Sequence, residues 1–397
     1  EIALELKPRE WAYASNMALA YIGWAAETDN LAQRFERYGR AVGLHDLAIT
    51  EMEEKITLYT IQNVTAHLLR ADALYDLGQM YETDELFQDE AIALAMFQAA
   101  MEDYQWVVDH HPREPVGYTG RGWVYLCLRK STGEDVVKRR EYLEQAIADF
   151  DQAVELTGAT VPEVDRDARY IPAFRGLGWA YYYLAMSYPE CAIGDDPPGA
   201  EQYQENLDPA IHYYTRLIGR QREAAIHYGI LAQFEWLLRR CDEYDQQKQL
   251  ERSLEAYDEA LKLAPDQAVW YDRRGHVHYA LAGLYQDPER KEQSRRSALK
   301  DLEAAATLRA NVQSWIDLAG VANEYHDYEA AVRAYEQAAA LEPENGDHFW
   351  KLGWRLYLIN DYQRSVEASD QAIALLPEEP MPYFNQGLAY AAMGDLQ

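Results

Sequence analysis

The sequence predicts an all-α protein, built as a solenoid of stacked helix pairs, and three observations support this fold class. Residues 311–380 hold two copies of one pattern at an offset of 34 residues, with Trp315 over Phe349 and Pro343 over Pro377. Apolar residues recur at i, i+3, i+4 and i+7, which gives each helix one buried face. Alanine-rich stretches dominate and β-branched runs are scarce, which favours helices over strands. One helix pair cannot bury its apolar face alone, so neighbouring pairs must share a core.

The two regular copies carry a specific set of residues. A small residue at the eighth position lets the paired helices approach closely, a large apolar residue fills the fourth position, and a proline follows the second helix. The first copy reads W..LA..A and then A...Y..A....P. The second keeps this spacing with Phe349 over Trp315, Gly353 over Ala319, Ser365 over Ala331 and Ser369 in the place of Tyr335. This pattern resembles the tetratricopeptide repeat family. The resemblance implies a right-handed α–α superhelix whose first helices line a concave groove that binds other proteins, and it implies no catalytic chemistry.

Residues 1–114 are predicted to form degenerate helix pairs of the same kind. The opening residues 1–8 resemble the end of a second helix, and the last repeat stops before its second helix, so we expect a segment of a longer chain. Helices are predicted at 11–26, 44–60, 66–81 and 90–110, the second of these as the partner of the first.

Residues 115–310 are predicted to form pairs with long extensions between their two helices, and residues 311–397 to form regular 34-residue repeats with the last one incomplete. The spacing between small positions falls from 56 to 51, 46 and 44 before it reaches 34. Residues 233–256 predict two long antiparallel helices with a turn near 241–245, whereas the Pro- and Gly-rich residues 189–208 predict a loop. The extensions either thicken the solenoid or form a wall beside the groove.

The small positions between which this spacing is measured are Gly122, Gly178, Gly229, Gly275, Ala319, Gly353 and Gly387.

Composition limits the classes of partner. The chain has 67 acidic and 37 basic residues and a net charge of −30, so it lacks the basic character that nucleic-acid binding requires. The acidity indicates either solubility of an extended surface or a basic partner. Two locally basic runs, 129–140 and 290–300, indicate either complements to helix dipoles or a docking edge. No apolar run is long enough to span a membrane, and we favour a cytoplasmic location.

No residue pattern indicates catalysis, a cofactor or a metal. None of the motifs GxxxxGK[ST], HExxH, CxxC or GxSxG occurs in the sequence. His276 and His278 lie two residues apart on a predicted helix and therefore cannot share a metal ion. The three cysteines, Cys127, Cys191 and Cys241, have no paired spacing, so we expect no disulfide framework and a buried, inert thiol at Cys127. We expect a chain that is not an enzyme.

The resemblance also indicates which residues face the groove. In this family the residues one, five and eight positions after the large fourth residue of a first helix point inward. The same mapping includes Leu126, and Arg175 alone matches the carboxylate clamp of one subset of the family. Tyrosine and tryptophan offer large, stiff area with a polar tip, as at interface hot spots, although single rings can instead pack against neighbouring helices. The predicted partner-binding residues are Trp123, Arg175, Trp179, Tyr182, His276, Tyr279, Trp350, Trp354 and Tyr357.

Two functions are consistent with these features. The first is a non-enzymatic scaffold that binds a protein or peptide segment, basic or apolar, in an aromatic-lined groove. The second is the sensor or regulatory arm of a larger enzyme or signalling protein whose catalytic domain lies outside residues 1–397. The full-length open reading frame would separate the two.

Overall fold

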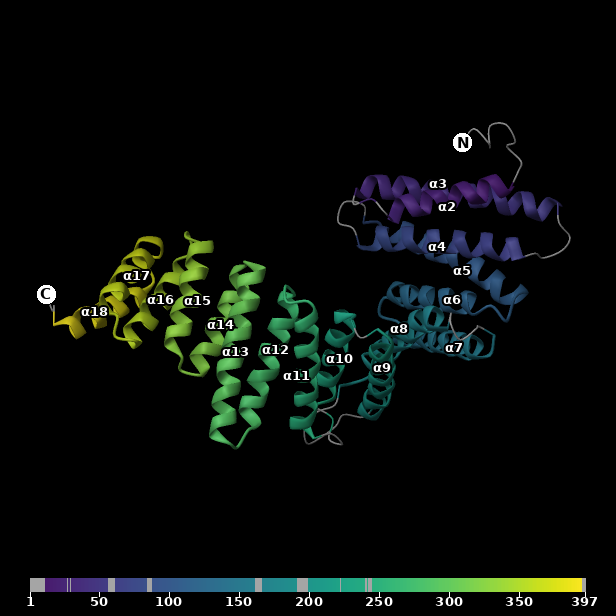
Figure 1. Ribbon diagram of the computed structural model, residues 1–397. Coiled ribbons are helices and arrows are strands. Elements are labelled where there is room, and N and C mark those ends of the chain that lie inside the picture. The colour runs from purple at the N-terminus through teal and green to yellow at the C-terminus, as the bar shows by residue number, and fades with distance from the viewer. Residues whose placement is uncertain are drawn as a thin grey trace. The chain divides into compact units, whose positions relative to one another are not determined.

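The computed structural model describes residues 11–26, 28, 30–55, 61–83, 88–160, 166–190, 199–221, 223–239, 241 and 245–394. The chain divides into two compact units, Glu1–Gln221 (unit 1) and Arg222–Gln397 (unit 2). Every regular element in the described ranges is a helix, and consecutive helices pack in pairs (Figure 1). The predicted all-α class of stacked helix pairs is therefore confirmed. The predicted zone boundaries at residues 114 and 310 concern repeat regularity and stay a prediction.

Unit 1 holds four helix pairs within its described residues. Successive pairs also touch, because α3 packs on α4, α5 on α6 and α7 on α8. Phe97, Tyr104 and Val124 belong to one buried cluster, so apolar residues of neighbouring pairs share a core. The pairs are α2 (Trp11–Ala26) with α3 (Leu31–Lys55), α4 (Ile61–Thr83) with α5 (Glu90–His110), α6 (Pro115–Leu128) with α7 (Val136–Thr160), and α8 (Arg166–Ala185) with α9 (Ala200–Arg220), and the short helix η1 (Arg129–Thr132) lies between α6 and α7.

Unit 2 holds four pairs and a single last helix within its described residues. In the regular repeats, Asp327 caps α15 by accepting a hydrogen bond from the Ala330 N–H at 2.9 Å, and Asp361 caps α17 in the same way. His326 and Asn360, which are 34 residues apart, have positive φ values of 59° and 64° in the turns before these caps. The elements are α10 (Ala225–Leu238) with α11 (Gln246–Leu263), α12 (Ala268–Leu284) with α13 (Pro288–Arg309), α14 (Val312–Glu324) with α15 (Tyr328–Leu341), α16 (Gly346–Leu358) with α17 (Tyr362–Leu375), and α18 (Pro380–Met393).

Several small positions bring the helices of a pair together as predicted, whereas a Cβ atom at Gly229 would lie 2.6 Å from Trp270 of the next pair. A Cβ atom added at Gly178 would lie 2.4 Å from the Tyr214 side chain, so a larger residue would push the second helix away. At Gly353 the neighbouring side chain is Ser369, at 3.0 Å from such an atom. The Ser365 hydroxyl then donates a hydrogen bond to the Gly353 carbonyl at 2.7 Å, which joins the two helices directly.

Four predicted boundaries are wrong. Helix α4 begins at Ile61 rather than at 66, and Val64 is already buried on it. Helix α3 begins at Leu31 rather than at 44. Phe35 and Tyr38 pack in a buried cluster, so the apolar face of the helix continues N-terminal to residue 44. Helix α9 begins at Ala200, inside the predicted loop 189–208, because Tyr203 and Leu207 are buried at helical spacing. Helix α10 has 14 residues, no more than the regular helix α15, so the surplus of this pair lies in α11 and the connection.

Several predicted segments lie outside the described residues. They are the opening second-helix segment 1–8, the end of the predicted helix 44–60, part of the predicted loop 189–208 and the middle of the turn near 241–245.

Three pairs share a buried ion pair that the sequence analysis did not anticipate. On α12, Arg274 donates from Nε and Nη2 to the two carboxylate oxygens of Asp301 on α13, both at 2.7 Å. The Asp301 side chain is 4 % exposed, so the pair lies between the helices. Each arginine stands directly before the small position of its first helix. The same two-bond pairing joins Arg70 on α4 to Asp103 on α5 and Arg121 on α6 to Asp149 on α7.

Candidate functional site

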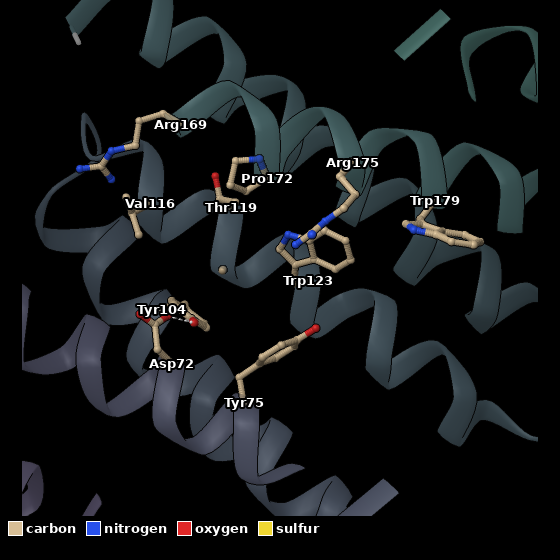
Figure 2. A pocket seen from close by; sticks show the side chains of 11 residues that line it. Asp72, Tyr75, Tyr104, Val116, Thr119, Trp123, Arg169, Pro172, Arg175 and Trp179 are labelled. Atoms are coloured by element: carbon tan, nitrogen blue, oxygen red, sulfur yellow. Dashed lines mark hydrogen bonds between the residues drawn. The ribbon is translucent and has the colours of Figure 1, made fainter. Parts of the chain in front are cut away.

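A hollow of about 700 Å³ opens in unit 1 between the first helices α4, α6 and α8 (Figure 2). This volume lies within the range of about 300–1,000 Å³ that is usual for ligand pockets. Three successive pairs contribute to the hollow. The lining residues are Asp72 and Tyr75 from α4, Tyr104 from α5, Val116, Thr119, Gly120 and Trp123 from α6, and Arg169, Pro172, Arg175 and Trp179 from α8.

Asp72 forms the acidic side of the hollow. Its Oδ1 atom accepts a hydrogen bond at 2.5 Å from the hydroxyl of Tyr104, which reaches across from the second helix α5. The Tyr104 ring passes Gly120 so closely that a Cβ atom at Gly120 would lie 2.2 Å from it. Asp72 stays open to the hollow, yet burial by the surrounding protein raises its pKa to about 6. The Tyr104 hydrogen bond lowers this pKa and the nearby Asp76 raises it.

Trp123 and Arg175 form the side of the hollow away from Asp72 (Figure 2). The guanidinium carbon of Arg175 lies 5.1 Å from the centre of the Trp123 ring. Stacking on a ring leaves the N–H groups at the guanidinium edge free to donate hydrogen bonds. Within the described ranges, no carboxylate lies within ion-pair distance of Arg175, whose side chain is exposed.

Three of the predicted groove residues, Trp123, Arg175 and Trp179, line this hollow together. Tyr182 lies beside it on α8, edge-on to Trp179 with ring centres 5.6 Å apart. Leu126, which the family mapping also placed in the groove, is only 3 % exposed and packs in the core instead. That these residues bind a partner stays a prediction.

The predicted residues on α12 lie in two different settings. His276 lines a small hollow of about 150 Å³, and its Nδ1 atom lies 2.8 Å from the Asp272 carbonyl oxygen. Tyr279 is 37 % exposed, donates a hydrogen bond to Glu324 at 2.5 Å, and stacks on Tyr325 with ring centres 5.7 Å apart. Both side chains therefore have partners within unit 2.

The predicted residues on α16 are Trp350, Trp354 and Tyr357, and all three are half-buried. The Trp354 and Tyr357 rings stack at 5.5 Å with an angle of 19° between their planes. The Trp350 indole N–H donates a hydrogen bond to Asp347 at 3.0 Å. Spacings of four and three residues place the three rings on one face of the helix.

Sequence reasoning missed Asp72 and Tyr75 because the register of the N-terminal repeats is degenerate. A signal was present in Arg70, which stands before Ala71 as Arg121 stands before the small Gly122. With Ala71 as the small position, Asp72 and Tyr75 fall one and four residues after it. Trp179 and Tyr182 have this same relation to Gly178, so the family mapping extends to α4.

Residues 241–267, which contain all of α11, match a family model described as a tetratricopeptide repeat. This match lies in a chain that already shows the 34-residue pattern and the helix pairs with small contact positions. Residues 241–267 are thus matched as a tetratricopeptide repeat. A search of the curated proteins finds no match.

Solved structures of other tetratricopeptide-repeat proteins are similar to this chain at low identity. YrrB, described as having an unusual peptide-binding site, is 20 % identical over 46 % of this chain and 85 % of its own, with a TM-score of 0.31. The C-terminal part of a repeat protein from Cytophaga hutchinsonii is 12 % identical over 80 % of this chain and 98 % of its own, with a TM-score of 0.46. The APC/C hetero-tetramer Cut9–Hcn1 is 14 % identical over 92 % of this chain and 58 % of its own, with a TM-score of 0.34. At these values, the structures say nothing about the site or partner of this chain.

The described parts of the chain also bear on other kinds of site. No group of three or more His, Cys, Asp or Glu side chains there is placed to hold a metal ion. Burial, together with Glu82, raises the pKa of the buried Cys127 thiol to about 11, so this thiol is protonated and unreactive at neutral pH. Cys241 is disulfide-bonded, which the unpaired spacing of the cysteines in the sequence did not indicate. None of the described helices combines the length and apolarity that crossing a bilayer needs.

The two basic runs have many of their cations engaged within the fold. Arg140 stacks on Tyr188, with its guanidinium carbon 3.8 Å from the ring centre. Arg290 donates to Glu251 at 2.9 Å. These contacts leave the runs with less free positive charge than the sequence suggests.

Proposed function

We propose that this chain is a non-enzymatic scaffold that binds a segment of another protein, and that the hollow between α4, α6 and α8 is its main contact site. The observation that carries the proposal is the meeting of three first helices at a hollow lined by Trp123, Trp179 and Tyr75 together with charged groups. A tetratricopeptide-repeat array supports a function of this class, since its stacked first helices present side chains of several repeats to one ligand.

The chemistry of the lining supports a protein partner. Tryptophan and tyrosine supply most of the binding energy at protein interfaces when a partner covers them. Trp123 and Trp179 are only half-buried, so each keeps ring surface that a bound segment can cover. An extended peptide crossing three helices would contact both rings and the charged side chains between them.

A peptide selection tests the proposal with the full chain. Immobilised protein selects from a phage-displayed library of random dodecapeptides, and the tightest peptide is synthesised with a fluorophore for anisotropy titration. Trp123→Ala is expected to weaken binding about 30-fold, which corresponds to the roughly 2 kcal/mol typical of a hot-spot residue. Trp24→Ala is the matched control, because Trp24 is 55 % exposed on α2, away from the hollow, and it should leave affinity within a factor of about two.

The same titration also tests a second surface, the face of α16 that carries Trp350 and Trp354. The double variant Trp350→Ala with Trp354→Ala removes two rings of the α16 face. Loss of binding in that variant, with full binding by Trp123→Ala, would contradict the assignment to unit 1 and move the site to unit 2. Circular dichroism and melting curves establish that each variant is folded before its affinity is compared.

A further inference from the structure

Two charged side chains in the hollow have no counter-ion in the described part of the chain. Asp72 accepts one hydrogen bond, from the uncharged hydroxyl of Tyr104, and Arg175 rests on the Trp123 ring. The third charged group of the lining, Arg169, differs because it lies 3.3 Å from a glutamate oxygen. Two opposite charges on different helices therefore face one hollow without being neutralised.

The carboxylate of Asp72 is held in a defined orientation. The Tyr104 hydroxyl binds Oδ1 and leaves Oδ2 without a partner within the described ranges. Gly120 makes this arrangement possible, because any side chain there would overlap the Tyr104 ring. Asp76, on the same helix α4, acts on Asp72 with a charge of the same sign. An oriented carboxylate without a cation is suited to receive a basic group.

The guanidinium of Arg175 lies over the Trp123 ring, with its carbon 5.1 Å from the ring centre. The edge of a planar guanidinium matches a carboxylate with two parallel hydrogen bonds. A basic side chain would be repelled here, and an acidic one would be repelled beside Asp72. The hollow therefore carries a negative charge at Asp72 on α4 and a positive charge at Arg175 on α8 (Figure 2).

We propose that the occupant of the hollow is a segment of mixed charge. It places a lysine or arginine against Asp72 and an aspartate or glutamate against Arg175, with an apolar or aromatic side chain between them on Trp123 and Tyr75. This inference rests on the proposed function, which makes the occupant a stretch of protein. The order of the two charges fixes the direction in which the segment crosses α4, α6 and α8.

Mixed charge also gives selectivity that a basic segment alone would lack. The chain carries a net charge of −30, so any strongly basic peptide is attracted to it without a specific site. A segment that must also satisfy Arg175 is distinguished from such peptides, because the wrong charge at that end is repelled.

A double-mutant cycle between protein and peptide tests this inference. The protein variants are Asp72→Asn, which keeps an acceptor for Tyr104, and Arg175→Gln. The peptide is the one selected on the full chain, with its basic residue replaced by glutamine or its acidic residue replaced by glutamine. Asp109→Asn is the control, since it removes an exposed carboxylate of unit 1 and changes the net charge equally.

We expect Asp72→Asn to weaken the selected peptide about tenfold or more and to have little effect on the peptide without its basic residue. Arg175→Gln is expected to couple in the same way to the acidic residue. Should Asp72→Asn fail to fold, Asp72→Ala takes its place in the same cycle, and the peptide without its basic residue should bind this variant and the wild-type protein with similar affinity. Asp109→Asn should leave all peptides unchanged.

The outcomes separate this inference from the proposed function. Binding that depends on Trp123 but shows no coupling between the charged groups overturns the mixed-charge inference and leaves the scaffold function standing. Binding that does not depend on Trp123 at all contradicts the site itself. Coupling of a basic residue to Asp72 without any coupling at Arg175 also overturns the proposal of a mixed-charge occupant.

Discussion

Single buried residues make the first pairs of unit 1 sensitive to acid. His45 on α3 is 0 % exposed, and neither of its ring nitrogens has a hydrogen-bond partner in the described part of the chain. Burial, and then the positive charge of Arg70, lower its pKa from 6.5 to about 4, against the opposing effect of Asp103 and Asp46. The folded protein therefore holds His45 neutral where the unfolded chain would protonate it.

Stability is accordingly expected to fall as the pH is lowered from about 6.5 towards 4. In this window the unfolded chain binds one more proton at His45, so acid favours unfolding. For a pKa of about 4 in the folded state, the loss is about 2 kcal/mol at pH 5 relative to neutral pH. Urea denaturation of wild type and His45→Gln at both pH values measures it, with His212→Gln as a control at an exposed position.

Comparing the loss of stability in the three proteins separates the contribution of His45 from that of the other groups that titrate between neutral pH and pH 5. Wild type and His212→Gln should lose stability on acidification by similar amounts, and His45→Gln should lose about 2 kcal/mol less. An equal loss in all three proteins would show that His45 is not held neutral by burial.

At the level of helix pairs, two chemical solutions fill the same structural position. Three first helices carry the arginine that binds an aspartate of the second helix, as in Arg274 with Asp301. The regular repeat α14–α15 instead has Leu318 and Ala334 at these places, both buried. Arginine with aspartate and leucine with alanine are thus alternative ways to fill the contact beside the small residue.

This equivalence predicts a difference between a single and a double substitution. Arg274→Ala leaves Asp301, which is 4 % exposed, as a buried carboxylate without its arginine, and should cost about 3–5 kcal/mol. Arg274→Leu combined with Asp301→Ala recreates the apolar solution and should stay within about 1–2 kcal/mol of wild type. Urea denaturation of the two variants measures both values. A double variant as unstable as the single one would show that the ion pair has a role the apolar pair cannot fill.

How far the elements could be predicted depended on the regularity of the local pattern. Helix α5 was predicted with its observed bounds, Glu90–His110, because its apolar spacing and the following proline are unambiguous. The start of α9 was not, because Pro- and Gly-rich composition in residues 189–208 hid the buried Tyr203 and Leu207. The composition of the whole stretch indicated a loop, but two buried apolar side chains at helical spacing are enough to hold this part of it as a helix.

The candidate site was predictable only in part. Trp123, Arg175 and Trp179 follow from counting along first helices whose small residue is a glycine. Asp72 lies in a repeat whose small residue, Ala71, is one of several alanines. The sequence alone therefore did not show which alanine holds the small position, and the structure was needed to place Asp72. The contact of Tyr104 with Asp72 joins residues 32 positions apart and depends on the space beside Gly120, which no local pattern encodes.

For the chain as a whole, the acidic charge and the repeat architecture bear on binding in different ways. A net charge of −30 attracts basic partners from a distance and speeds their association, without choosing between them. The hollow in unit 1 is expected to select between partners, because its rings and opposite charges lie at defined places on α4, α6 and α8. A bound segment is therefore expected to cover Trp123 and Trp179.

Fluorine NMR of the full chain labelled with 5-fluorotryptophan tests this location most directly. The ten tryptophans give separate signals that single Trp→Phe variants assign, and the selected peptide is added to saturation. We expect the Trp123 and Trp179 resonances to shift while that of the exposed Trp24 stays in place. Unchanged Trp123 and Trp179 resonances at saturation, with shifts at Trp350 and Trp354 instead, would contradict it.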